Sequence, residues 1–194
     1  MAQVRAVPLG GRLGILVRGD EKLGADAYIG IVVDRSGSMH RDKLERAKAF
    51  CTLLAESARG VPGIVGHINA FDDTTFFEMG NFERTSVASL TSGGGNNDSG
   101  ALSRAAELAI HSRKRHRLLI MISDGSPTEC TFESLKNLVA RLTRQHETVC
   151  VQVAVEPLTE IAFPHHVDLS QYSLDEAVAR FGKMIMRLTA PWRS

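Results

Sequence analysis

The sequence predicts an α/β fold with a mostly parallel central sheet, and three observations carry that prediction. Continuous apolar runs, typical of strands buried on both faces, alternate along the chain with stretches of helical periodicity. Two of these runs are followed within two residues by an aspartate, Asp34 and Asp124. Two other short runs are separated by only a few polar residues, which indicates a hairpin. Together they predict a Rossmann-like three-layer sandwich, with one antiparallel edge strand and helices on both faces of the sheet.

The first strand and the first helix follow directly from the pattern of apolar residues. Residues 28–33 are continuously apolar and are expected to be a buried strand. Residues 43–59 are expected to be a helix, because their apolar side chains recur every three or four positions. Asp42 and Glu45 have the spacing of an N-terminal capping box, and Gly60 is a natural stop for this helix.

The middle of the chain predicts a hairpin, a second helix and a second central strand. Residues 64–71 and 75–79 are short strand-like runs on either side of two aspartates, so they are expected to pair as a hairpin. Residues 99–112 have one apolar helical stripe. Residues 117–122 form the next apolar run and are expected to be another buried strand.

The last part of the chain continues the alternation. A helix over 133–146, a strand over 148–155 and a short strand over 166–169 are expected in turn. Ser173 and Glu176 form a capping box that opens a final helix ending near residue 188.

The chain is expected to contain one α/β domain and a short extension. The domain is predicted over residues 27–190. Residues 1–26 differ in character, because two apolar runs flank Gly10 and Gly11, which predicts an N-terminal β-hairpin.

Composition narrows the classes of function. Of the 194 residues, 43% are hydrophobic and 23% are charged, and the formal net charge is +1, so no global field recruits nucleic acid or an anionic membrane. The longest apolar stretches have about eight residues, against the ~20 that span a bilayer. No apolar signal-peptide core is seen near the start, and the odd count of three cysteines, expected to be reduced and buried, favours a cytoplasmic protein.

Three polar loops are expected at one edge of the predicted sheet. Residues 34–38 read Asp-Arg-Ser-Gly-Ser and directly follow the first strand. Residues 92–99 are rich in glycine and asparagine and precede a helix, and residues 123–127 follow another buried strand. In an open parallel sheet, ligands bind at the carboxyl ends of the strands, near the point where the strand order reverses. These loops are therefore the candidate functional site.

The residue types in these loops suit a hard divalent cation. Asp34, Ser36 and Ser38 are spaced two residues apart, and Gly37 lets the chain turn so that their oxygens converge. Asp124 is expected to approach from the neighbouring strand. Such oxygens suit Mg²⁺, and also Mn²⁺ or Ca²⁺. Two carboxylates would roughly neutralise the dication and leave an open coordination position, which suits an acidic side chain of another protein.

These motifs resemble the metal-ion-dependent adhesion site of von Willebrand factor A domains. The likeness rests on the D-x-S-x-S motif at 34–38, the glycine-rich loop before a helix, and Ile-Ser-Asp-Gly at 122–125. It extends in element order over about residues 27–190. It implies a magnesium site made by loop residues and a non-catalytic module that binds another protein.

Longer stretches resemble one intracellular group within that family. Residues 34–39, 96–102 and 121–127 are similar to the A-domain of the cobaltochelatase large-ring subunit and related proteins. In that group the A-domain commonly works with a AAA+ ATPase of the MoxR or chelatase kind. The resemblance therefore implies an adaptor or regulatory component with such an ATPase as partner.

The second loop departs from the family pattern. A threonine is usual where Asn96 stands in this chain, so either Asn96 ligates through its carbonyl oxygen or a water, or Asp98 replaces it. If Asp98 binds the metal directly, three carboxylates surround the ion, and the site is less ready to accept a partner's carboxylate. Arg35, inside the first loop, is either a solvent-facing residue or a contact for an acidic partner.

Two other functions compete with metal-dependent binding. A degenerate A-domain would bind partners by its surface without metal. A metal-dependent phosphotransferase-like enzyme would use Asp34 as a nucleophile. Such enzymes normally need a second acid two residues later, where Ser36 stands here. The sequence therefore favours a binding module over an enzyme.

Overall fold

The computed structural model describes residues 26–125 and 127–193. In this part of the chain the strands are β1 (Ala27–Asp34), β2 (Ile64–Phe71), β3 (Phe76–Asn81), β4 (His116–Ser123), β5 (Thr148–Ala154) and β6 (His165–Asp168). The α-helices are α1 (Asp42–Ala58), α2 (Asp98–His111), α3 (Phe132–His146) and α4 (Leu174–Leu188). Short 3-10 helices are η1 (Gly37–Met39), η2 (Val87–Ser89) and η3 (Ala190–Arg193).

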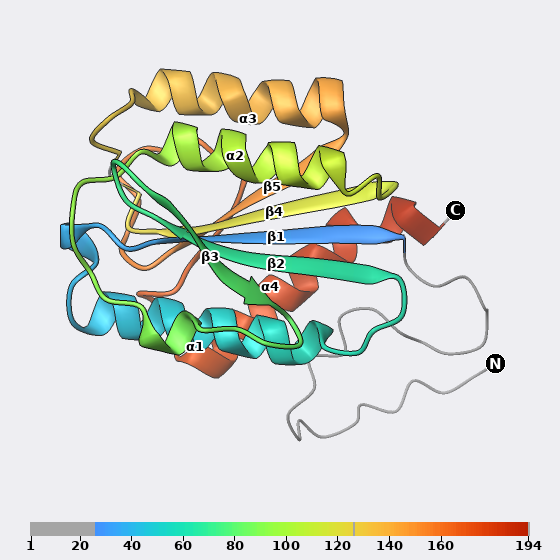
Figure 1. Cartoon of the computed structure of the whole chain (residues 1–194), viewed down its shortest axis with the longest axis horizontal. Helices are drawn as coiled ribbons and strands as arrows, with labels where there is room; N and C mark the ends of the chain where they lie inside the picture. Colours follow the sequence, from blue (N-terminus) through green and yellow to red (C-terminus); the bar gives the residue numbers. More distant parts are fainter. Residues whose placement is uncertain (1–25, 126, 194) are drawn as a thin grey trace.

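The strands form one sheet in the order β3-β2-β1-β4-β5-β6. All neighbouring strands are parallel except β2 and β3, which form an antiparallel hairpin at one edge. Helices α2 and α3 cover one face of the sheet, and α1 and α4 cover the other (Figure 1). The predicted three-layer α/β sandwich is confirmed. The hairpin predicted in residues 1–26 lies outside the described residues, apart from Asp26.

The boundaries of these elements lie within two residues of the predicted ones. One local prediction is wrong: Asp42 and Glu45 do not form a capping box. Arg41 occupies the N-cap of α1 with a φ of 57°, and no side chain caps the helix. Asp42 is instead the first helical residue, so both acids lie in the first turn, where negative charge favours the positive end of the helix dipole.

The predicted capping box of α4 is present. The Ser173 hydroxyl accepts a hydrogen bond from the Glu176 amide at 3.4 Å, and the Glu176 carboxylate accepts one from the Ser173 amide at 3.0 Å. We expect Ser173→Ala to lower the free energy of unfolding by about 1 kcal/mol, because an orphan amide loses its acceptor. Urea unfolding of this variant measures the effect. Gln171→Ala, an exposed residue outside the helix, is the control, and an equal loss in both variants would contradict the assignment.

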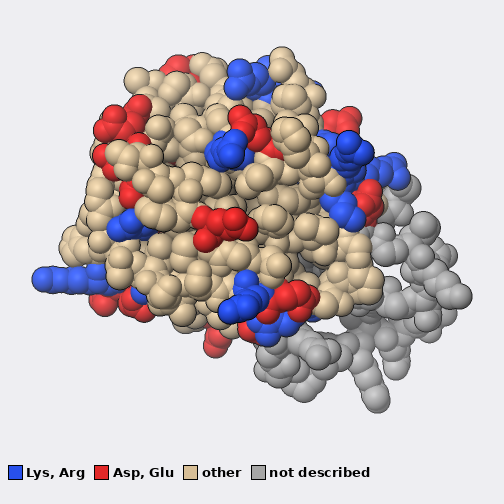
Figure 2. Space-filling model, in the orientation of Figure 1, with Lys and Arg blue, Asp and Glu red and all other residues tan. Residues whose placement is uncertain are grey.

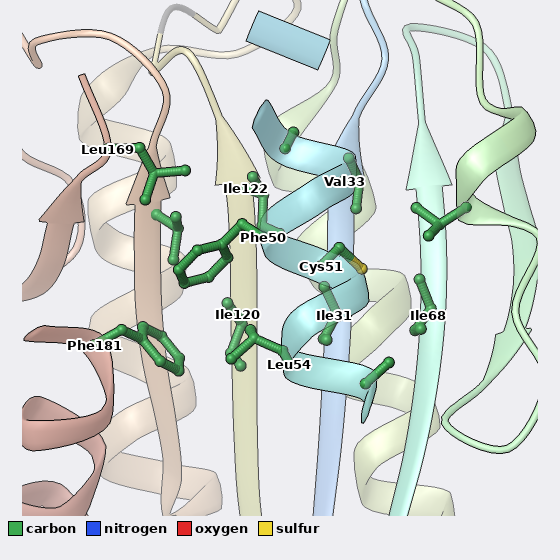
Figure 3. Close-up of a cluster of buried hydrophobic side chains, with 14 of the residues drawn as sticks. Ile31, Val33, Phe50, Cys51, Leu54, Ile68, Ile120, Ile122, Leu169 and Phe181 are labelled. Atoms are coloured by element: carbon green, nitrogen blue, oxygen red, sulfur yellow. The ribbon is translucent and has the colours of Figure 1, made fainter. Parts of the chain in front are cut away.

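The core has two halves, one on each side of the sheet. On the α1 and α4 side, the rings of Phe50 and Phe181 meet edge to face with their centroids 5.3 Å apart. Figure 3 shows these rings beside apolar side chains of β1 and β4, such as Ile31 and Ile120. On the other side, residues such as Leu102 pack against the sheet from α2 and α3. Because both faces are covered, the sheet holds its strand ends in fixed positions.

The three cysteines are free thiols. Cys51 and Cys150 are buried as expected, and burial raises the pKa of each thiol to about 12. Cys130 is only half-buried, which differs from the prediction.

The surface carries charges of both signs. Acidic and basic side chains are interspersed on the face seen in Figure 2. Within the described ranges, no helix has the length and apolar character needed to cross a membrane.

Candidate metal centre

The candidate site lies at the carboxyl ends of β1 and β4. These strands are adjacent and parallel, with Val33 opposite Ile122. The chain leaves β1 toward β2 on one side and later returns to β4 on the other side, so the strand order reverses at this point. Asp34 ends β1, and Asp124 directly follows β4. The topology therefore brings both predicted aspartates to the crevice where open α/β sheets bind ligands.

The first loop turns its oxygens toward one another. Asp34 is fully buried, and its Oδ1 accepts a hydrogen bond from the Ser36 amide at 2.7 Å. The Oγ atoms of Ser36 and Ser38 are 3.0 Å apart. The loop thus has a folded arrangement in which one carboxylate and two hydroxyls are neighbours.

The first and second loops are joined by their backbones. The Gly37 amide donates to the Gly94 carbonyl, and the Gly93 amide donates to the Arg35 carbonyl, each at 2.8 Å. Gly94 has a φ of 78°, and a Cβ there would lie 2.8 Å from a carboxylate oxygen of Asp73. Glycine is therefore required at residue 94 for this close approach.

Arg35 is a brace between loops. Its Nε donates to the Thr91 carbonyl at 2.8 Å, and its Nη1 lies 3.3 Å from Oδ2 of Asp72. Its guanidinium also lies over the ring of Phe77, 4.9 Å from the centroid. The Arg35 side chain is only 19% exposed, because it joins the first loop to Thr91 and to the β2–β3 turn. A contact with an acidic partner stays a prediction.

Asn96 is oriented by Thr128. The Thr128 amide donates to Oδ1 of Asn96 at 2.6 Å, so this oxygen must face Thr128. The Nδ2 of Asn96 consequently faces Asp34 and donates to its Oδ2 at 3.3 Å. The Asn96 side chain therefore presents N–H, not a carbonyl oxygen, to the Asp34 carboxylate.

Asp98 is the unusual residue of the site. It begins α2 and is 1% exposed, and its carboxylate oxygens receive no hydrogen bond from any other residue that the structure describes. Burial raises its pKa to about 7, and the negative charges of Asp34 and Asp124 add to the effect. Burial likewise raises the pKa of Asp34 to about 6, with a smaller contribution from Asp124. A buried carboxylate without partners is costly unless it meets a cation or a proton.

Sequence reasoning missed two residues at this site. Lys43, near the start of α1, places its Nζ 3.6 Å from Oδ2 of Asp124 and 2.8 Å from Oε1 of Glu156. Thr128 holds Asn96 through its amide and its hydroxyl. No motif marks Lys43, because the contact depends on how α1 packs over the sheet. Thr128 follows the Asp124 loop by a few residues, and that proximity was the available signal.

The donors present suit a hydrated oxygen-binding cation. Among the residues that the structure describes, no three His, Cys, Asp or Glu side chains form a metal-ligand cluster. The site instead combines separated carboxylates with the hydroxyls of Ser36 and Ser38. Mg²⁺ fits this pattern, because it prefers oxygen and keeps several of its waters. The buried oxygens of Asp98, which lack partners, also fit a nearby cation.

The comparisons with known proteins identify the family. A model of the von Willebrand factor type A domain matches residues 29–175. The chain belongs to the von Willebrand factor A family. Members of this family often mediate protein–protein interactions. A search of curated proteins finds no match to this A-domain.

Solved structures share the fold of this A-domain at low sequence identity. The SpRpn10 VWA domain has a TM-score of 0.61 and 15% identity, covering 79% of this chain and 94% of its own. A von Willebrand factor type A protein from Catenulispora acidiphila has a TM-score of 0.62 and 16% identity. The match covers 84% of this chain and 43% of the Catenulispora chain. Proximal thread matrix protein 1 of the mussel byssus, with zinc in its MIDAS motif, has a TM-score of 0.58 and 15% identity. The match covers 82% of this chain and 46% of the mussel protein chain. This chain spans only 40% and 29% of two pilus-tip structures from Porphyromonas gingivalis that it also matches.

Proposed function

We propose that this A-domain binds Mg²⁺ at the candidate metal centre and uses the metal to bind an acidic side chain of another protein. Asp34, Ser36, Ser38, Asp98 and Asp124 would hold the ion directly or through its waters. Asn96 would orient Asp34 without ligating the ion, because its amide N–H faces that carboxylate. When bound, the metal supplies a positive charge with an exchangeable coordination position.

The buried carboxylate of Asp98 carries this proposal. Its oxygens receive no hydrogen bond from another described residue, and burial, followed by the charges of Asp34 and Asp124, raises its pKa. An acid that only starts a helix would be expected in contact with solvent or with the amides of following residues. A divalent cation between these groups would offset both the repulsion and the lost hydration.

Lys43 bears on whether such a site can accept an acidic partner. Three carboxylates around a dication would leave one negative charge in excess. The ammonium of Lys43 offsets part of that excess, because it lies 3.6 Å from Asp124 although it also pairs with Glu156 at 2.8 Å. Lys43 would therefore lower the repulsion that a partner's carboxylate meets at the open position.

The partner is proposed from the family and from the motifs. The mussel thread protein, which shares this fold, has zinc in its adhesion-site motif, and this supports the proposal of a metal at the corresponding loops. The stretches 34–39, 96–102 and 121–127 resemble the cobaltochelatase-like group. We therefore propose an acidic loop of a AAA+ ATPase of the MoxR or chelatase kind as the partner, in the cytoplasm.

Calorimetric titration with Mg²⁺, Mn²⁺ and Ca²⁺ tests the metal site. We expect wild type to bind Mg²⁺, and Asp34→Ala and Asp124→Asn to lose the binding heat, because each removes a charged oxygen donor. Asp175→Ala, which removes an exposed acid of α4, is the matched control and should bind as wild type does. Thermal unfolding establishes that each variant is folded.

The opposite results separate the competing functions. Folded wild-type protein with no response to any of the three metals would favour a degenerate A-domain. Hydrolysis of a phosphate monoester by the purified chain would favour the phosphotransferase-like alternative. A pull-down from the source organism with and without EDTA identifies the partner, and its capture in EDTA would contradict metal-dependent binding.

A further inference from the structure

A groove lies between the edge strand β6 and helix α4, and at one end its lining residue Leu158 lies against Gly125, next to Asp124. It consists of two adjoining hollows of about 460 Å³ and 420 Å³ that share Arg180 and Met184. The first continues past β6 to the β5–β6 loop, where Ile161 is 55% exposed. We call this surface the β6 groove. It combines apolar side chains with a row of cations.

The backbone of β6 is open along this groove. In the described sheet, β6 is the terminal strand and pairs only with β5. The Leu169 amide bonds to the Ala154 carbonyl at 2.7 Å, so the alternate residues His166 and Asp168 turn their N–H and C=O away from β5. No backbone hydrogen bond outside the sheet is recorded for His166 or Asp168 in the described part of the chain. These groups can pair with an added strand.

The cations of the groove lie on one side of α4. Arg180, Lys183 and Arg187 are exposed, line the hollows, and are spaced along about 10 Å of helix. Lys183 and Arg187 form no salt bridge with any described residue. Arg180 stacks on Tyr172 at 4.0 Å, which leaves the edge of its guanidinium open to a carboxylate.

Two acids lie close to this row. Glu176 is held by its own capping box, and the Asp168 carboxylate accepts hydrogen bonds from the amide and hydroxyl of Ser170 at 2.7 Å and 2.6 Å. Both acids are therefore occupied by local donors, and the far end of the row, at Lys183 and Arg187, keeps its positive charge.

We propose that the β6 groove binds an extended acidic segment of a partner protein, which adds to the sheet as a strand beside β6. In an extended strand, alternate side chains are about 6.7 Å apart on one face, so two or three acids at alternate positions match the row on α4. The intervening side chains would point to the opposite face of the sheet, where the exposed Ile161 lies beside α3. Main-chain pairing gives affinity, and the cations select acidic sequences.

The charge of the groove argues against the chain's own first residues as the occupant. Residues 1–25 contain four Lys or Arg and two Asp or Glu, so the segment is itself basic. The free main-chain groups of His166 and Asp168 favour a peptide over nucleic acid, which has no strand to pair with them. Tyr172, which lines the first hollow, is stacked under Arg180, so that face of its ring is not open to a base.

Fluorescence anisotropy with the full chain tests the proposal. The probe is a short fluorescein-labelled peptide that alternates Glu and Val. We expect it to bind wild type, and Arg180→Glu/Lys183→Glu/Arg187→Glu to weaken it about tenfold or more. The control is Arg84→Glu/Arg104→Glu/Arg113→Glu, which changes net charge equally at exposed positions outside the hollows and should bind as wild type does. Melting curves of both variants confirm that they are folded.

A second set of probes separates strand addition from simple charge attraction. The same peptide with N-methyl groups at alternate residues keeps its acids but cannot pair with a strand edge, and we expect it to bind about tenfold more weakly. Hydrogen exchange should also slow at the amides of His166 and Asp168 when the unmodified peptide binds. Equal binding of the two peptides, stronger binding of single-stranded DNA, or no difference between the two triple variants would overturn the proposal.

Discussion

Asp98→Asn is expected to stabilise the metal-free protein by about 2 kcal/mol and to remove its stabilisation by Mg²⁺. Asparagine has nearly the same shape as aspartate, and it takes one negative charge out of a buried site that already contains Asp34 and Asp124. Its amide can also donate to those carboxylates. The measurement is urea unfolding at pH 8, above the raised pKa of about 7, in EDTA and again in excess Mg²⁺.

Asp98→Asn should raise stability in EDTA but should lack the stabilisation that wild type gains from Mg²⁺. This pair of results distinguishes a metal ligand from a structural acid. Wild type should be less stable than the variant in EDTA, and it should gain stability with Mg²⁺ according to its affinity. Asp175→Asn, on the exposed first turn of α4, should show neither effect. Loss of stability in EDTA would mean that the Asp98 charge is satisfied within the protein.

The fold was predictable because its signals are local and repeat along the chain. The apolar run that became β1 and the helical stripe that became α1 each fix an element, and their alternation implies a parallel sheet. The error at the start of α1 has a local cause. Arg41 has a positive φ and occupies the N-cap position. Asp42 is therefore the first helical residue, one position beyond the one from which a side chain caps the helix.

The sequence predicted which loops form the site, but not how their side chains are oriented. Asp34 and Asp124 follow adjacent strands, so topology alone brings them together. The direction of the Asn96 amide depends on the Thr128 backbone, and the Lys43 contact depends on the packing of α1. No sequence motif predicts either contact, because each joins residues that only the tertiary structure brings together. The hydrogen bond from the Thr128 amide turns the Asn96 N–H toward Asp34, and no spacing in the sequence reveals that bond.

Asn96→Asp is expected to have the opposite effect to Asp98→Asn. The new carboxylate would keep its bond from the Thr128 amide, but its other oxygen would face Oδ2 of Asp34 in place of an N–H donor. Another buried negative charge beside Asp34 and Asp98 should lower stability in EDTA by about 3 kcal/mol. Mg²⁺ should restore most of that loss, because the cation binds the folded state and offsets the added charge.

Asn96→Ala separates charge from lost hydrogen bonds. It removes the bonds to Thr128 and Asp34 but adds no carboxylate. Its stability relative to wild type should therefore be lowered by a similar amount in EDTA and in Mg²⁺. If Asn96→Asp loses the same free energy in both conditions, no cation approaches Asp34 from that side. If Mg²⁺ restores the stability of Asn96→Asp but not that of Asn96→Ala, a carboxylate at residue 96 strengthens metal binding. The amide nitrogen of Asn96, which takes the place of that carboxylate oxygen in wild type, then limits the affinity of the site for the metal.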